Sequence, residues 1–128
     1  MGRRILVVDD EPDILQLTKL RLEASGFEVM TAATGPEGLE KARGEKPDLM
    51  VLDLMLPGLN GYEICTMLKQ DTRYQEIPIV LFTAKAQEKD EKLGMACGAN
   101  AYVRKPFKGE ELLQKIQALL VARQPASQ

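Results

Sequence analysis

Short apolar runs alternate with longer amphipathic stretches five times along the chain. Apolar runs of four or five residues, bounded by charged or turn-forming residues, are typical of buried strands, while the stretches between them have helical spacing. Strands that alternate with helices usually form a parallel sheet with helices on its faces. We therefore predict an α/β fold with five parallel strands, at residues 5–8, 28–32, 49–53, 79–83 and 101–104.

The predicted helices have start and stop signals that agree with this alternation. The first, at residues 12–25, begins with Pro12, where a missing N–H removes no hydrogen bond, and Gly26 ends it. A fourth is expected at about residues 88–97, ended by Gly98. The last helix places an apolar face on the core, formed by Leu112, Leu113, Ile116, Leu119 and Leu120.

Two further helices open with paired polar residues. Thr34 is followed three residues later by Glu37, and Asn60 is followed in the same way by Glu63. This spacing is that of a capping box, in which the two side chains bond the first backbone N–H groups of a helix. The second and third helices are expected to start at these positions.

The length of 128 residues predicts one domain, which we place at residues 1–121, followed by a polar tail or the start of a linker at residues 122–128. The 17 basic and 19 acidic residues nearly balance, so no positive charge excess indicates nucleic-acid binding. The apolar run at residues 5–8 is too short for a signal peptide or a membrane span. A cytoplasmic protein is therefore expected.

The two cysteines, Cys65 and Cys97, are far apart in the sequence, and the chain has no histidine. This pattern excludes the usual zinc sites, which combine cysteine pairs or cysteine with histidine. Each cysteine has helical spacing relative to apolar neighbours. Both are therefore interpreted as small core residues.

Polar residues collect where the predicted strands end. Asp9 and Asp10 follow the first strand, Asp53 ends the third, Thr83 ends the fourth and Lys105 follows the fifth. Right-handed crossovers bring the carboxyl ends of all parallel strands to one edge of the sheet, where open α/β sheets bind ligands. Carboxylates suit Mg²⁺, and a carboxylate can attack phosphorus when the charge of the incoming phosphoryl group is neutralised. The set therefore indicates metal-assisted phosphoryl chemistry.

Each of these residues also has a purely structural interpretation. Asp10 or Glu11 can cap the helix that follows, which explains one acid there but not two or three. Thr83 alone is a good strand residue, and Lys105 alone is an ordinary surface charge. Asp53 is harder to explain in this way, because an unpaired carboxylate between apolar residues at a strand end is costly.

Four motifs carry a resemblance to a known family: ILVVDDEPD, PDLMVLDLMLPGLNGYE, PIVLFTAKA and GANAYVRKPF. In this order and spacing, over residues 4–121, they resemble the receiver domain of bacterial two-component response regulators. The resemblance implies a single domain with the flavodoxin-like fold, a doubly wound five-stranded parallel sheet of (βα)5 type.

By this resemblance, Asp53 is the phosphoacceptor, and the phosphoryl group comes from a phosphohistidine on a sensor histidine kinase or a histidine phosphotransfer protein. Asp9, Asp10 and Asp53, together with the backbone carbonyl of Met55, are expected to hold Mg²⁺. In the family, the positions of Met55 and Lys85 flank the approach of the attacking water and bear on the lifetime of the phosphoryl group.

The resemblance also assigns the switch. Thr83 and Lys105 are expected to contact the phosphoryl group, and Tyr102 is expected to change rotamer and turn inward when Thr83 moves. The peptide bond between Lys105 and Pro106 is expected to be cis, which proline permits.

The implied function is a phosphorylation-dependent signalling switch in a phosphorelay, in which the face formed by helix four, strand five and helix five changes for a downstream protein or effector domain. The protein is then not an enzyme but a phosphoprotein domain that assists its own phosphorylation and dephosphorylation. A phosphorylation-dependent dimer is possible, whereas direct binding to nucleic acid or to a membrane is not expected. A stand-alone receiver is slightly favoured over one cut from a longer regulator.

Three other classes of protein share parts of this pattern. A phosphatase of the haloacid dehalogenase type needs a second aspartate two residues after the nucleophile, and Met55 occupies that position. A flavodoxin-like flavin binder needs a phosphate-binding loop after the first strand, where the acids of DDEPD repel phosphate. An interaction module that is never phosphorylated stays open as an alternative, although such a module does not require the complete set of five residues.

Overall fold

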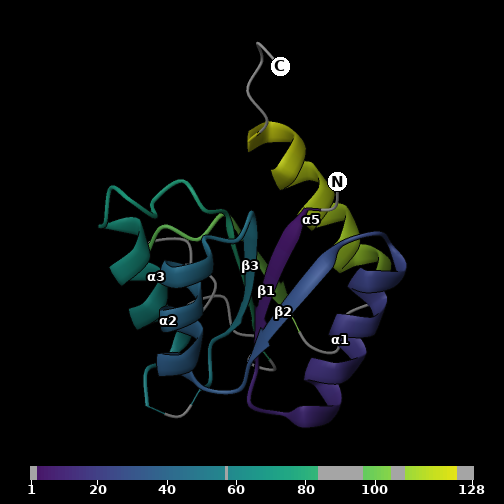
Figure 1. The fold of residues 1–128 in the computed structure, drawn as a ribbon, viewed down its shortest axis with the longest axis horizontal. Helices are drawn as coiled ribbons and strands as arrows, with labels where there is room; N and C mark the ends of the chain where they lie inside the picture. Colours follow the sequence, from purple (N-terminus) through teal and green to yellow (C-terminus); the bar gives the residue numbers. More distant parts are fainter. Residues whose placement is uncertain (1–2, 57, 84–96, 105–108, 124–128) are drawn as a thin grey trace.

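The computed structural model describes residues 3–56, 58–83, 97–104 and 109–123, and within them five strands form one parallel sheet (Figure 1). The strand order is β2-β1-β3-β4-β5, the flavodoxin-like order. All strands are parallel, and β2 is added on one side of β1 whereas β3, β4 and β5 are added on the other. The predicted fold class is confirmed. The strands are β1 (Arg4–Val8), β2 (Glu28–Ala32), β3 (Leu49–Asp53), β4 (Ile79–Thr83) and β5 (Ala101–Arg104).

The sequence placed four of these strands at their observed bounds, while β1 begins one residue earlier than predicted. Arg4 belongs to the strand because it pairs in register with Glu28 of β2. Its guanidinium also lies 2.7 Å from the carboxylate of Glu45. A charged residue can therefore extend this strand at its exposed amino end, which the apolar pattern alone does not indicate.

Helices cover both faces of the sheet, with α2 and α3 on one face and α1 and α5 on the other (Figure 1). The predicted fourth helix at residues 88–97 lies outside the described residues except for Cys97, which is in a turn. The described helices are α1 (Pro12–Ala24), α2 (Gly35–Glu45), α3 (Gly61–Lys69) and α5 (Gly109–Arg123).

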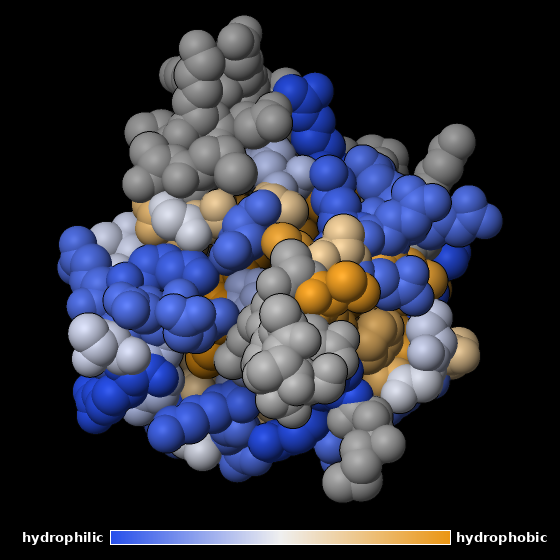
Figure 2. Space-filling model, turned by 90° about the horizontal axis from the view of Figure 1, so that it is seen from above, coloured by the Kyte–Doolittle hydropathy of each residue, from blue (hydrophilic) through white to orange (hydrophobic). Residues whose placement is uncertain are grey.

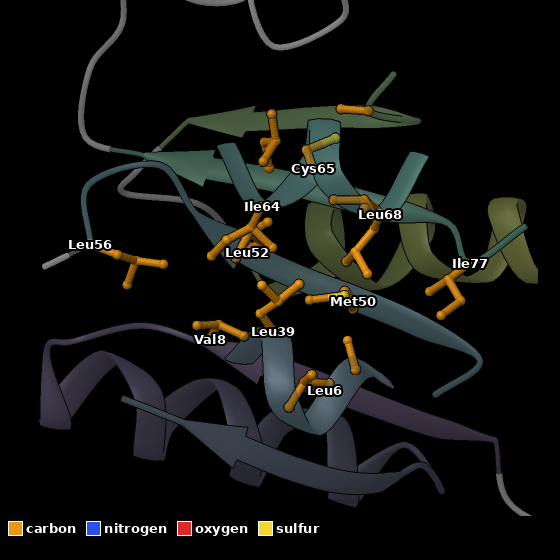
Figure 3. Packing of buried hydrophobic residues seen from close by; sticks show 14 of the residues in the cluster. Leu6, Val8, Leu39, Met50, Leu52, Leu56, Ile64, Cys65, Leu68 and Ile77 are labelled. Carbon is orange, nitrogen blue, oxygen red and sulfur yellow. The ribbon is translucent and has the colours of Figure 1, made fainter. Parts of the chain in front are cut away.

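The core consists of two apolar layers, one on each face of the sheet. Successive residues of a strand point to opposite faces, so Leu6 and Val8 of β1 belong to the layer under α2 and α3, while Ile5 and Val7 belong to the other. Figure 3 shows the first layer, where Leu39 of α2 and other side chains meet those of β1 and β3. The strands β1, β3 and β4 are buried on both faces, which explains why each contains a continuous apolar run.

The first turns of α2 and α3 are held by the residues that the sequence predicted. Asn60 and Glu63 form a complete capping box, with each side chain bonded to the backbone N–H of the other. Thr34 accepts a hydrogen bond from the Glu37 N–H, but the Glu37 carboxylate accepts from the N–H of Ala33 instead of Thr34. The second helix therefore starts as predicted, with one bond shifted by a residue.

The last helix, α5, packs as predicted: Leu112, Ile116 and Leu120 are buried, and Leu113 and Leu119 are partly buried against the same layer. Viewed from the end at which α5 finishes, the described surface is mostly hydrophilic, with hydrophobic residues gathered toward its middle (Figure 2). Among the described helices, none combines the length and apolar character that a membrane crossing requires.

Candidate functional site

Three aspartates meet at the carboxyl edge of the sheet, which is the lower edge in Figure 1. Val8 of β1 pairs with Leu52 of β3, so the residues that follow them, Asp9 and Asp53, lie on neighbouring strands. Asp10 comes next in the chain. Each of the three aspartates offers a carboxylate oxygen, and these oxygens lie within 4.8 Å of one another. The structure thus brings together the acids that the sequence singled out.

Two of these carboxylates are buried and fixed by backbone hydrogen bonds. Asp9 is 0% exposed, and its Oδ1 accepts a hydrogen bond of 2.9 Å from the N–H of Glu11. Asp53 is 3% exposed, and its Oδ1 accepts one of 3.1 Å from the N–H of Met55. In both cases an aspartate bonds its own backbone two residues on, which fixes the side chain at the start of a loop.

The helix-capping explanation for the acids after β1 does not hold. The residue at the N-cap of α1 is Glu11, and its side chain makes no capping hydrogen bond. Asp10 is exposed and belongs to the group of three carboxylates. Because acids next to one another repel, and the helix does not use them as caps, the start of α1 does not explain their placement together.

The loop after β3 is held tightly against the residue that carries the central carboxylate. The Gly61 N–H donates to the carbonyl of Leu54 at 3.0 Å, and a Cβ atom at Gly61 would lie only 2.6 Å from the carbonyl oxygen of Asp53. Only glycine fits there without a shift of the backbone. No local sequence pattern indicates this requirement for glycine, because the constraint comes from a distance between two segments of the chain.

Met55 lies at the rim of the site, with 56% of its surface exposed. Its backbone N–H contacts Asp53, which keeps the residue close to the three acids. A thioether side chain has no group that can transfer a proton in place of a second aspartate. This agrees with the argument against a phosphatase of the haloacid dehalogenase type.

The other predicted site residues are only partly described. Thr83 ends β4 opposite Arg104 of β5, which brings the ends of these two strands to the same edge as the acids. The side chain of Thr83, and the whole of Lys85, Lys105 and Pro106, lie outside the described residues. The expected cis peptide bond falls in that part as well.

Tyr102 is 8% exposed and packs in the apolar layer under α3, in register with Leu81 of β4. The family resemblance implies that this side chain turns inward when the switch operates. In the structure the side chain is already buried.

The chemistry of the site follows from its donor atoms. Three carboxylates within a small volume provide the hard oxygen ligands that Mg²⁺ prefers, and Mg²⁺ is commonly held by one or two carboxylates with water and phosphate oxygens completing its shell. The residues present therefore fit a divalent cation of this kind. The fold and the site together define a class of protein, namely open α/β domains with a cluster of acids at the carboxyl edge of the sheet.

Residues 5–117 match the family described as the response regulator receiver domain. The chain is 48% identical over 120 residues to the alkaline phosphatase synthesis transcriptional regulatory protein PhoP of Bacillus subtilis, and 42% identical to the DNA-binding response regulator MtrA of Mycolicibacterium smegmatis. These matches cover 94% of this chain but 49% and 51% of the two relatives. The chain thus spans about half the length of these relatives.

Solved structures agree with this assignment. The response regulator receiver domain protein (CheY-like) from Methanospirillum hungatei is 34% identical, with a TM-score of 0.90 over 96% of this chain and 97% of the other. CheY4 of Vibrio cholerae is 32% identical, with a TM-score of 0.87 over 93% and 99%. The chain belongs to the response regulator receiver domain family, the signalling domain of two-component systems.

Proposed function

We propose that Asp53 is the phosphoacceptor of this receiver domain. The observation that carries the proposal is the position of its carboxylate, which is 3% exposed at the end of β3 and has an oxygen within 4.8 Å of those of Asp9 and Asp10. Of the three acids, Asp53 lies on the central strand β3, between β1 and β4. It therefore lies where groups from the ends of both neighbouring strands can reach an incoming phosphoryl group.

The proposed reaction is a transfer from a phosphohistidine of a sensor histidine kinase or a histidine phosphotransfer protein. A carboxylate oxygen of Asp53 attacks phosphorus, the P–N bond breaks with its electron pair passing to the imidazole nitrogen, and an acyl phosphate forms. The hydrogen bond from the Met55 N–H holds the carboxylate in one orientation. The same site, with water as the attacking group, assists the later loss of the phosphoryl group.

We propose that Asp9, Asp10 and Asp53, together with the backbone carbonyl of Met55, hold Mg²⁺. The ion when bound supplies positive charge that offsets the charge of the phosphoryl oxygens. Asp9 and Asp53 are oriented for this task by the hydrogen bonds that they accept from the backbone N–H groups of Glu11 and Met55. Thr83 and Lys105 remain the proposed contacts of the phosphoryl group from the ends of β4 and β5.

The proposed output is a change of the face formed by helix four, β5 and α5. A phosphoryl group adds about −1.5 to −2 charge and strong acceptor oxygens, so Thr83 gains a partner and moves toward it. That movement opens space beside β4. Because Tyr102 is already buried in the structure, the proposed effect of phosphorylation is to raise further the population of this buried position.

A downstream protein, an effector domain or a second copy of the chain that prefers this face reads the change. The two curated relatives are named as DNA-binding or transcriptional regulators, and this chain spans about half of each. We propose that the receiver passes its signal to such a partner in the cytoplasm and does not itself contact nucleic acid or a membrane.

Labelling by a small phosphodonor tests the central assignment. Incubated with Mg²⁺ and acetyl phosphate, the protein should gain one phosphoryl group, measured by intact mass. The Asp53→Asn variant should gain none, because an amide does not act as the nucleophile. Asp13→Asn, at an exposed acid in the first turn of α1, is the matched control and should be labelled like the wild type. Equal labelling of the Asp53→Asn variant would refute the assignment.

A further inference from the structure

The two cysteines, separated by 32 positions in the sequence, meet in the folded protein. Cys65 lies on α3 and is fully buried in the apolar layer, and its Sγ donates a hydrogen bond of 3.6 Å to the carbonyl oxygen of Cys97. Figure 3 shows Cys65 beside Ile64 and Leu68, with its sulfur directed away from Leu6 and Val8 of β1. Cys97 packs against the same layer but is partly exposed.

Contacts of the residues that follow Cys97 hold this part of the chain in place. A Cβ atom at the next residue, Gly98, would lie 2.8 Å from the Cγ of Lys69, so the backbone there runs directly over α3. Asn100 exchanges two hydrogen bonds with Ile79 of β4, one from its backbone N–H at 2.8 Å and one to its side-chain oxygen at 2.9 Å. The segment with Cys97 is thus fixed to α3 and to the sheet.

The surroundings give the two thiols different acidities. The neighbouring Cys97 and burial in the apolar layer both raise the pKa of the Cys65 thiol. The proximity of Cys65 lowers the pKa of the Cys97 thiol, and the positive charge of Lys69 acts in the same direction. A thiolate is the reactive form of cysteine, so Cys97 is the better nucleophile of the pair.

We propose that Cys65 and Cys97 form a redox-sensitive dithiol that hydrogen peroxide converts into an intramolecular disulfide. The Cys97 thiolate attacks one peroxide oxygen, the O–O bond breaks, and hydroxide leaves behind a sulfenic acid on Cys97. The sulfur of Cys65 then attacks the Cys97 sulfur, and the Cys65 proton leaves with the sulfenic hydroxyl as water. The two thiols lose two electrons in total, which reduce the peroxide.

The division of exposure suits this order of steps. Cys97 is partly exposed and can meet the oxidant. Cys65 is fully buried, so in the proposed order it reacts with the oxidised Cys97 and not with peroxide. Neither cysteine takes part in the proposed phosphorylation, so the two proposals are independent. The bond would join α3, which begins against Asp53, to the segment that leads into β5 and Tyr102.

The test treats the full chain with hydrogen peroxide under native conditions, removes the oxidant, and alkylates with N-ethylmaleimide after denaturation. Intact mass should show a monomer that has lost two hydrogens and both alkylation sites, and dithiothreitol should restore both. Tryptic peptides should show Cys65 linked to Cys97. The experiment does not involve phosphorylation of Asp53. Its result therefore tests the disulfide proposal alone and leaves the proposed phosphoacceptor to its own test.

Two variants assign the roles. In Cys97→Ala, Cys65 should stay fully alkylatable at the same peroxide dose, and in Cys65→Ala, Cys97 should stop at a sulfenic acid that dimedone labels. Circular dichroism checks that each variant is folded. If Cys65→Ala does not fold, the wild type and Cys97→Ala still test whether the disulfide forms and whether it requires Cys97. Wild-type thiols that remain fully alkylatable, a disulfide found only between two chains, or equal oxidation of Cys65 in Cys97→Ala would each overturn the proposal.

Discussion

Gly61 is the residue at which the fold comes closest to the central carboxylate. A Cβ atom there would lie 2.6 Å from the Asp53 carbonyl oxygen and 2.9 Å from the Cα of Leu54. Both of these are backbone atoms, which cannot move aside as a flexible side chain can. The start of α3 and the end of β3 are therefore coupled by the absence of a side chain.

We expect Gly61→Ala to lower the free energy of unfolding by roughly 1 to 3 kcal/mol, because the new methyl group must displace backbone. Gly44, in the last turn of α2, has no atom within 4 Å of the corresponding Cβ position, so Gly44→Ala should raise stability by about 0.4 to 1 kcal/mol. Urea unfolding of both variants measures the difference. A Gly61→Ala protein as stable as Gly44→Ala would contradict the close contact.

For single residues, the sequence indicated the side chains with suitable chemistry for a site, but not the residues that matter because of contacts between distant segments. Asp9, Asp10 and Asp53 were predictable, because charged residues directly after apolar runs stand out and parallel strands must end at one edge. Gly61 was not, because its requirement arises only when α3 meets β3. The meeting of Cys65 and Cys97 was missed for the same reason, although the core position predicted for Cys65 is confirmed.

The starts of α2 and α3 show how far helix signals can be read from the sequence. The spacing identified both pairs of capping residues, and in α3 both expected bonds form. In α2 the long Glu37 side chain reaches the N–H of Ala33 and also lies 3.3 Å from the Nζ of Lys41. The sequence predicts which two residues form such a capping box. Which backbone N–H group the Glu37 side chain bonds depends on the path of the preceding loop.

Loss of the α3 cap should be measurable in the whole protein. Asn60→Ala removes the acceptor for the Glu63 N–H and should cost about 1 kcal/mol of unfolding free energy. Asn60→Asp keeps an oxygen at this position and should stay within a few tenths of a kcal/mol of the wild type. Thermal or urea unfolding followed by circular dichroism compares the two; equal losses in both variants would argue against the capping role.

For the molecule as a whole, the topology was predictable and one side-chain state was not. Alternating strands and helices with right-handed crossovers leave few possible sheet orders, and the family resemblance selects the observed one. The buried position of Tyr102 depends on how several elements pack around it, which no local pattern encodes. The division of the chain at residue 121 stays a prediction, and α5 continues to Arg123.

The repulsion among the three acids should appear in the stability of the whole protein. A ligand that binds only the folded state stabilises it by RT ln(1 + [L]/Kd), about 2.7 kcal/mol at a hundredfold excess over Kd. Millimolar Mg²⁺ should therefore raise the melting temperature. Asp10→Asn removes one of the repelling charges, so this variant should melt higher than the wild type without metal and gain less from Mg²⁺.

Differential scanning calorimetry with and without Mg²⁺ measures both effects, and Asp13→Asn on the exposed start of α1 serves as the control with an unchanged Mg²⁺ gain. An Asp10→Asn protein that melts lower without metal and keeps the full gain would show that Asp10 neither repels its neighbours nor contributes to the cation site.

The parallel sheet also separates the acids from the place where the chain leaves the domain. The strands end at the lower edge in Figure 1, while α5 runs back to the opposite end of the domain, where it finishes at Arg123. Additional sequence joined after α5 therefore starts on the far side from Asp9, Asp10 and Asp53. A further domain that begins after α5 would therefore leave the three acids accessible to a second protein.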